Sequence, residues 1–293
     1  MKINTAIFDL DGTLLDEAHQ LPLRNIQAIH NLQQAGITFM AATGRNYQSV
    51  APMFEKEGIR CDCLLLNGAL ITDAQGRRLS HTPLPLDTAI AAIHILENSG
   101  LPYHMYTDEG VVSSSPEKGR AMFMQHMRKQ GMRDDEISRL MEESSFGSYD
   151  REIEDVFRYL QEKPILYKLE AFGDDRQQLH FVRTQLQALK HTAVTNSIAD
   201  NIEITAAHAQ KGLALKKLCE EQGLHPDEVM VFGDSLNDLS MMQEFRYSFA
   251  MANAADIIKE AANYQTRSNA EHGVAYVLER LLKTVEEKKV SKF

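Results

Sequence analysis

The chain has 293 residues, 43% of them hydrophobic and 25% charged, which is ordinary for a globular protein and enough for two compact domains. Its formal net charge of −10 argues against binding to nucleic acid, which requires a basic face. No apolar run approaches the ~18 residues of a membrane span, no signal-peptide layout is present, and three cysteines suit neither a zinc site nor a disulfide scaffold. We therefore expect a cytoplasmic protein, a monomer or weak dimer, that binds neither nucleic acid nor membrane.

The first 80 residues alternate between strand and helix patterns. Short apolar runs that end in Gly or Asp are typical of buried strands, whereas apolar residues three or four apart are typical of amphipathic helices. This alternation predicts a parallel sheet with right-handed crossovers. The expected elements are a strand at 2–10, a helix at 22–36, a strand at 37–44, a helix at 46–58 and a third strand at 61–72.

A middle region has a different pattern, and the opening pattern then returns. The middle predicts a helix at 86–100, a hairpin at 102–115, helices and loops at 117–163, a strand at 164–172, a helix at 175–190 and a hairpin at 192–205. After it come helices at 211–223, 238–245, 256–262 and 272–289, with strands at 228–235 and 247–254. We therefore expect an α/β protein. Its Rossmann-like parallel-sheet core, residues 1–83 and 206–293, is divided by an inserted α+β domain, residues 84–205.

Polar residues follow the ends of several predicted core strands. Asp9 and Asp11 lie at the end of the first strand, Thr43 at the end of the second and Asp234 at the end of a later strand, while Lys211 begins a helix. Ligands of open α/β sheets bind beyond the carboxyl ends of the strands. The sequence therefore predicts that these carboxylates, the hydroxyl and the ammonium share one edge of the sheet.

This set of groups is suited to phosphoryl transfer, although Asp11-Gly12 taken alone would also fit an ordinary turn. Asp9 and Asp234 offer the hard oxygen ligands that Mg²⁺ prefers. A carboxylate can then attack phosphorus to form an aspartyl-phosphate, and Asp11 can protonate the leaving alkoxide and later deprotonate water. The non-reacting phosphate oxygens would be held by Thr43, the Gly44 amide and Lys211.

Four motifs in order resemble those of the haloacid dehalogenase superfamily. They are DLDGT at 9–13, ATG at 42–44, Lys211, and GDSLND at 233–238. Each lies at the edge of a predicted strand or helix. A single short Asp-Gly string would be common by chance, but four in order indicate this superfamily.

The spacing of the motifs places the inserted domain. Lys211 lies 168 residues after Thr43, far more than one crossover needs, so the insertion lies between the second and third motifs. This layout resembles the Cof-type phosphatases with a C2 cap. The same resemblance extends to TGR at 43–45, NGA at 67–69, KG at 211–212 and GVA at 273–275.

The resemblance implies a role for each motif residue. Asp9 would be the nucleophile and Asp11 the acid/base. Mg²⁺ would be held by the Asp9 carboxylate, the Asp11 main-chain carbonyl and Asp234. Phosphate contacts would come from the Leu10 amide, Thr43, Gly44, Lys211 and Asn237, with Asp238 as a support; the candidate substrate contacts are Arg45, Asn67, His104 and Tyr106.

The function expected from these motifs is Mg²⁺-dependent hydrolysis of a small phosphorylated metabolite through an aspartyl-phosphate. Sugar phosphates, nucleotides and cofactor phosphates are all candidate substrates. Two alternatives stay open: a phosphotransferase or phosphomutase that passes phosphate to a sugar, and a regulator that binds a phosphorylated ligand without turnover. An added acceptor alcohol would distinguish the transferase from the phosphatase.

Overall fold

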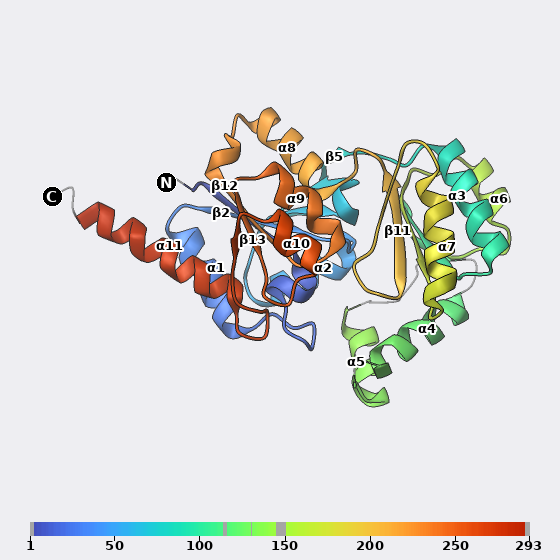
Figure 1. Ribbon diagram of the computed structural model, residues 1–293, viewed down its shortest axis with the longest axis horizontal. Helices are drawn as coiled ribbons and strands as arrows, with labels where there is room; N and C mark the ends of the chain where they lie inside the picture. Colours follow the sequence, from blue (N-terminus) through green and yellow to red (C-terminus); the bar gives the residue numbers. More distant parts are fainter. Residues whose placement is uncertain (1–2, 114–115, 130, 145–150, 291–293) are drawn as a thin grey trace.

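A computed structural model describes residues 3–113, 116–129, 131–144 and 151–290. It contains an eight-stranded sheet, here the core sheet, and a six-stranded sheet, here the second sheet. The two sheets and their helices form two bodies next to each other, and the chain passes from the first to the second and back (Figure 1). No helix of the described ranges combines the length and the apolar character needed to cross a membrane.

The core sheet is parallel over six of its eight strands, with the order β14-β13-β12-β1-β2-β3-β4-β5. Its central strands are covered on both faces, so β1 and β12 are buried along their whole length, as their continuous apolar runs predict. The strands are β1 Thr5–Phe8, β2 Thr38–Ala42, β3 Asp62–Leu65, β4 Leu70–Thr72, β5 Arg78–His81, β12 Val229–Gly233, β13 Tyr247–Ala250 and β14 Tyr264–Gln265.

In the part of the chain that the structure describes, six helices pack around the core sheet. Helix α1 contacts α11, and α8 contacts α9, which in turn contacts α10. All six were expected from the sequence, to within a few residues at their ends. They are α1 Leu23–Gln34, α2 Tyr47–Lys56, α8 Lys211–Gln222, α9 Leu239–Glu244, α10 Asp256–Ala261 and α11 Gly273–Val290.

The single strand predicted over 61–72 is wrong. The chain instead reverses after β3 through a short turn, Leu66–Gly68, and returns as β4 antiparallel to β3. Three consecutive residues have positive φ, namely Leu66 (51°), Asn67 (59°) and Gly68 (97°), and this left-handed backbone cannot continue a strand. The two-residue strands β14 and β8 (Arg151–Glu152) were also not predicted.

The second sheet has the order β10-β11-β9-β6-β7-β8 and is antiparallel except between β7 and β8. It contains both hairpins that the sequence predicts. Helices α3 and α7 pack together on one face, against β9 and β11. The elements are β6 Tyr103–Thr107, β7 Gly110–Ser113, β9 Leu166–Phe172, β10 Thr192–Thr195, β11 Asn201–Ala206, α3 Leu86–Ser99, α6 Val156–Gln161 and α7 Arg176–Gln187.

The other face of the second sheet is polar and is turned toward the core. In β9 and β11 apolar side chains alternate with polar ones, so the polar residues share one face of the sheet. That face includes Lys168, whose Nζ donates to the carbonyl oxygen of Gly44 in the core at 2.8 Å. A polar surface therefore lies buried between the two sheets.

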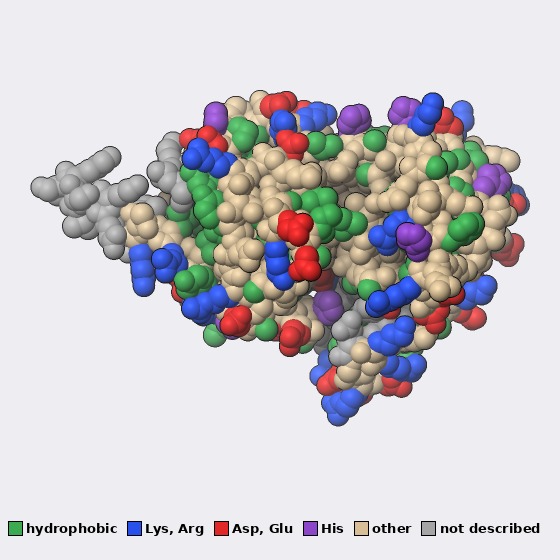
Figure 2. All heavy atoms as spheres, viewed as in Figure 1, with side chains coloured by type: hydrophobic (Ala, Val, Ile, Leu, Met, Phe, Trp, Pro, Cys, Tyr) green, Lys and Arg blue, Asp and Glu red, His purple; other side chains and the backbone are tan. Residues whose placement is uncertain are grey.

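Helices α4 (Pro116–Lys129) and α5 (Asp134–Ser144) extend from the second sheet below the junction, and α5 also contacts α2 (Figure 1). They enclose a small apolar cluster of their own, built from Phe123, Met127 and Ile137. Their outer surfaces carry Lys and Arg side chains mixed with Asp and Glu (Figure 2). Helix α4 thereby covers one side of the junction.

The close contact between α8 and α9 allows a stability prediction. Gly212 donates its N–H to Ser240 Oγ at 2.9 Å, and a Cβ at Gly212 would lie 2.2 Å from the Ser240 carbonyl group. The substitution Gly212→Ala should therefore lower the free energy of unfolding by ~1–3 kcal/mol, the usual cost of overpacking. Urea unfolding measures this, and Lys217→Ala on the exposed side of α8 should change it by less than ~0.5 kcal/mol. Equal effects of the two substitutions would contradict the proposed contact.

Candidate active site

The carboxyl ends of β1, β2 and β12 meet at one edge of the core sheet. Asp9 directly follows β1, and its N–H donates to the carbonyl of Phe232 in β12 at 3.1 Å. Leu10 begins the helical turn Leu10–Leu14, so its amide also lies at this edge. The structure thus brings together the strand ends from which the sequence predicts a site.

Lys211 lies at the centre of this edge and is 0% exposed. As the first residue of α8, it donates from Nζ to Asp9 Oδ1 and to Asp238 Oδ1, both at 2.6 Å. The other carboxylate oxygen of Asp238 accepts the N–H groups of Asp234 (2.9 Å) and Ser235 (3.0 Å). Asp238 therefore anchors both Lys211 and the loop after β12.

A third carboxylate, that of Asp234, lies beside the two that Lys211 contacts. Ligand oxygens of Asp9, Asp234 and Asp238 all lie within 4.8 Å of one another. Burial, and then the charge of Asp238, raise the pKa of Asp9 above its ordinary value and that of Asp234 to about 7. Burial and the neighbouring negative charge both disfavour the ionised carboxylates, and a bound cation would offset both effects.

The donor set fits Mg²⁺, which binds through one or two carboxylates together with water and phosphate oxygens. Asp238 is already engaged by Lys211 and two amides, so Asp9 and Asp234 are the carboxylates better placed to hold an ion. Asp234 is itself oriented by the hydroxyl of Thr13, which donates to its Oδ1 at 3.0 Å. Both carboxylates belong to the set that the sequence predicts.

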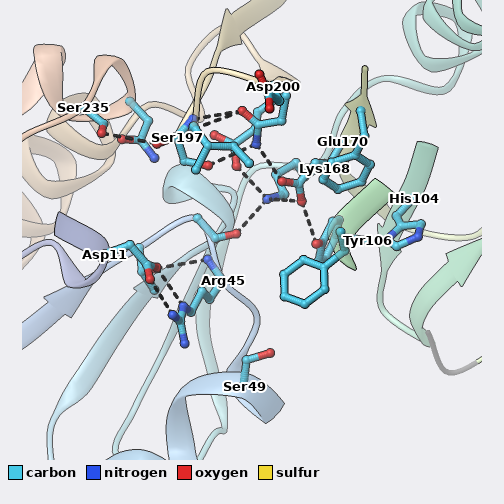
Figure 3. A pocket seen from close by; sticks show the side chains of 18 of the residues that line it. Asp11, Arg45, Ser49, His104, Tyr106, Lys168, Glu170, Ser197, Asp200 and Ser235 are labelled. Atoms are coloured by element: carbon cyan, nitrogen blue, oxygen red, sulfur yellow. Dashed lines mark hydrogen bonds and ion pairs between the residues drawn. The ribbon is translucent and has the colours of Figure 1, made fainter. Parts of the chain in front are cut away.

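Asp11 makes contacts that the sequence did not predict. Arg45 donates to it from Nε (2.8 Å) and Nη2 (2.5 Å) (Figure 3). His19 Nδ1 lies 2.8 Å from its Oδ1. Burial alone would raise the pKa of Asp11, but Arg45 and His19 outweigh it and hold that pKa well below its usual range. Asp11 is therefore ionised here, and it can take up a proton only when its contacts with Arg45 and His19 loosen.

The expected phosphate-binding residues form a compact group beside this pair. Thr43 and Gly44 follow β2, and Thr43 Oγ1 accepts the N–H of Arg45 at 3.1 Å. Asn237 donates from Nδ2 to Asn67 Oδ1 at 3.1 Å, while its own Oδ1 is buried without a hydrogen-bond partner among the described residues. The second Nδ2 hydrogen of Asn237 and the hydroxyl hydrogen of Thr43 are the donors that these two side chains can offer to a phosphate oxygen.

A cavity of about 130 Å³ joins this edge to the polar face of the second sheet. From the second sheet it is lined by His104 and Tyr106, which the sequence suggested as substrate contacts, and from α4 by Phe123 and Met127. His104 Nε2 is buried and has no partner in the described part of the chain, and burial lowers the pKa of His104. The neutral imidazole thus offers one nitrogen for a ligand hydrogen bond.

The buried charges that line the cavity from the second sheet were not predicted from the sequence. Lys168, Glu170 and Glu203 form one hydrogen-bonded cluster there, with Asn201 donating to Glu170 (Figure 3). Their signal is visible in LYKLEAF and DNIEIT, where polar or charged residues alternate with apolar ones at a spacing of two. His19 was missed as well, because no motif marks the loop in which it lies.

Comparisons with known proteins agree with this geometry. The family model described as haloacid dehalogenase-like hydrolase matches residues 6–278.

Among relatives, phosphatase YwpJ of Bacillus subtilis is 30% identical over 283 residues, covering 94% of this chain and 98% of the relative. The 5-amino-6-(5-phospho-D-ribitylamino)uracil phosphatase YwtE of the same organism is 31% identical over 280 residues, covering 94% and 96%. A solved haloacid dehalogenase-like hydrolase from B. subtilis superposes with a TM-score of 0.86 at 28% identity, over 95% of this chain and all of that one. The chain therefore belongs to the haloacid dehalogenase-like hydrolases and is a Cof-type phosphatase.

Proposed function

We propose that this phosphatase hydrolyses small phosphate monoesters with Mg²⁺ through an aspartyl-phosphate on Asp9. The observation that carries the proposal is the buried Lys211 ammonium, which joins Asp9 to Asp238 beside Asp234 at the ends of parallel strands. The proposal includes a division into a core domain, residues 1–83 and 206–293, and a C2-type cap domain, residues 84–205. The cavity between the two sheets would hold the substrate.

The reaction would take place in two displacements at phosphorus. In the first, an oxygen of Asp9 forms a bond to phosphorus while the bond to the ester oxygen breaks, and Asp11 gives its proton to that oxygen. In the second, water attacks the aspartyl-phosphate, Asp11 takes a proton from the water, and inorganic phosphate leaves with the Asp9 carboxylate restored. Non-reacting oxygens would be held by the Leu10 and Gly44 amides, Thr43, Lys211 and Asn237.

Mg²⁺, when bound by Asp9, Asp234 and the Asp11 main-chain carbonyl, would supply the positive charge that lets a phosphate dianion approach these carboxylates. The chain's own cation there, Lys211, is already shared between two carboxylates. Lys211 would hold Asp9 in position and stabilise the negative charge that develops on the transferring group.

Asp11 needs a proton for the first displacement, yet its contacts with Arg45 keep it ionised. Binding of the substrate would loosen these contacts, and the freed Arg45 guanidinium would then contact the substrate, the role that the sequence suggested. The ionised arrangement seen here corresponds to the second displacement, in which Asp11 acts as a base.

The substrate would be a small phosphorylated metabolite: a sugar phosphate, a nucleotide or a cofactor phosphate. A relative is named for a substrate that joins a phosphorylated ribityl chain to a uracil, which supports including compounds of this kind among the candidates. Polar groups at Tyr106 and His104 and apolar groups at Phe123 and Met127 both line the cavity. Such a lining suits a leaving group with a polar chain and an apolar or aromatic ring.

The three free, buried cysteines are consistent with the proposed cytoplasmic location.

Two substitutions test the roles of the first two carboxylates. Asp9→Asn removes the nucleophile and should abolish turnover. Mass spectrometry after acid quenching should then detect no phosphorylated protein. Asp11→Asn removes proton transfer and should lower kcat by about 10²–10⁴-fold while inorganic phosphate still inhibits competitively. Steady-state hydrolysis of p-nitrophenyl phosphate measures both. Wild-type turnover by Asp9→Asn would refute the mechanism.

Metal removal provides a second test. Without a cation, a phosphate dianion would be repelled by three nearby carboxylates. EDTA should therefore abolish hydrolysis, and excess Mg²⁺ should restore it. Asp234→Asn should weaken Mg²⁺ binding in calorimetry, whereas Asp256→Asn, at a side chain that is 96% exposed, should not. Undiminished turnover in chelator would exclude the proposed site.

A third test addresses the support that Asp238 gives to Lys211. Asp238→Asn deprives a buried ammonium of one of its two carboxylates and should lower the free energy of unfolding by ~3 kcal/mol, as expected when one partner of a buried pair is removed. It should also lower kcat, because Lys211 would no longer be held toward Asp9. Chemical denaturation and kinetics measure the two effects, again with Asp256→Asn as the control. A fully stable and active Asp238→Asn protein would show that Lys211 does not depend on this contact.

A further inference from the structure

Lys168 is a buried ammonium that the proposed mechanism does not use. It is 1% exposed, and its Nζ contacts the Gly44 carbonyl at 2.8 Å, Glu203 Oε1 at 2.9 Å and Glu170 Oε2 at 3.1 Å. An ammonium has three hydrogens to donate, so these three acceptors use all of them. Lys168 is therefore a fixed link between the second sheet and the loop after β2, with no donor left over for a substrate.

The first branch of this link leads to Thr43. The carbonyl of Gly44 and the N–H of Arg45 belong to one planar peptide group, so fixing the carbonyl also fixes the N–H. That N–H donates to Thr43 Oγ1 at 3.1 Å. Because the oxygen is held as an acceptor, the hydroxyl hydrogen of Thr43 is left to point to a phosphate oxygen.

The second branch leads to Asn237. Glu203 accepts from Lys168 at Oε1 and from Asn67 Nδ2 at Oε2, the latter at 3.0 Å. Asn67 Oδ1 in turn accepts from Asn237 Nδ2 at 3.1 Å. The Asn67 backbone has a φ of 59°, a conformation that Asn adopts more readily than most residues.

Gly44 lies where the two branches meet. A Cβ at this position would lie 3.0 Å from both Asn67 Oδ1 and Glu203 Oε1, and 3.7 Å from Asn237 Nδ2. Because residue 44 has no side chain, the two branches approach each other here without displacing the side chains of Asn67 or Glu203. Both branches begin in the second sheet and end on a residue expected to bind phosphate.

We propose that Lys168 and Glu203 are positioning residues, which orient Thr43 and Asn237 for phosphate when the second sheet is docked on the core. This inference rests on the proposed function, in which Thr43 and Asn237 hold the phosphate oxygens. The phosphate site is then pre-organised only in the docked arrangement, which also encloses the cavity. Because the phosphate is common to all substrates, the effect of these residues does not depend on the leaving group.

Glu170 provides a matched control. It lies directly opposite Glu203 in the β9–β11 ladder and also pairs with Lys168. Its other contacts, from Tyr106 Oη at 2.7 Å and Asn201 Nδ2 at 2.8 Å, come from the second sheet. Within the described ranges Glu170 has no hydrogen bond to the core, whereas Glu203 has one. Gln at either position removes the same charge beside Lys168.

The test compares Glu203→Gln with Glu170→Gln. Glutamine has one acceptor oxygen, so at position 203 it cannot accept from both Lys168 and Asn67. Glu203→Gln should raise the inhibition constant of inorganic phosphate roughly tenfold, the effect of one charge-assisted hydrogen bond. It should lower kcat/KM by a similar factor for p-nitrophenyl phosphate and for bulkier esters. Glu170→Gln should change the phosphate inhibition constant by less than about twofold, the residual expected when no bond to the core is lost.

Three results would overturn the inference. One is an equal effect of the two variants on phosphate inhibition. Another is a loss in Glu203→Gln that varies with the leaving group while phosphate inhibition is unchanged, which would make Glu203 a substrate contact. The third is a lower unfolding temperature with kcat and phosphate inhibition intact, which would make the link purely structural.

Lys168→Met removes both branches and should weaken phosphate inhibition more than Glu203→Gln does. If Lys168→Met does not fold, the comparison of Glu203→Gln with Glu170→Gln is the test.

The outcome is separable from the proposed function. If the wild type hydrolyses esters and Asp9→Asn does not, yet the glutamate variants behave alike, the phosphatase mechanism stands and the positioning role falls.

Discussion

The buried ammonium of Lys211 is the interaction on which the site depends. Asp9 and Asp238 follow different strands, β1 and β12, and Lys211 starts a helix that precedes the second of them. Removing either carboxylate would leave a charge buried without its partner, which is costly in a low-dielectric interior. The strand order and the register of β1 with β12 must therefore be kept for the charges to balance. In this protein the same contacts stabilise the sheet edge and fix the position of Asp9, the residue proposed to react.

A second buried ammonium, Lys168, has a corresponding place at the junction of the two sheets. It lies between Glu170 and Glu203, which raise its pKa above the ordinary value although burial alone would lower it. Each ammonium hydrogen meets an acceptor, and complete pairing is the condition under which buried charge is tolerated. A polar face can therefore be buried against the core. It encloses the cavity and limits the access of water to a reaction for which water is also a reactant.

In the proposed mechanism Asp11 serves two steps. Arg45 and His19 hold it in the ionised form, so it can carry a proton in either step only when these contacts loosen. Arg45 belongs to the loop whose carbonyl Lys168 holds, so the contacts of Asp11 are close to the junction as well. The second sheet, the loop after β2 and Asp11 are thus neighbours in one hydrogen-bonded region.

Local patterns in the sequence determined most of the core: the parallel strands, the six helices and the motif residues at the strand ends follow from periodicity and from rules about where parallel strands end. Tertiary structure decided the rest. The reversal after β3 depends on left-handed backbone at Leu66 and Asn67, and β8 and β14 are too short to leave a pattern. The polar face of the second sheet and the Asp11–Arg45 pair join residues that are distant in the chain. Which buried charges meet is a property of the packed protein, because pairing is set by distance in space, and a single sequence shows only distance along the chain.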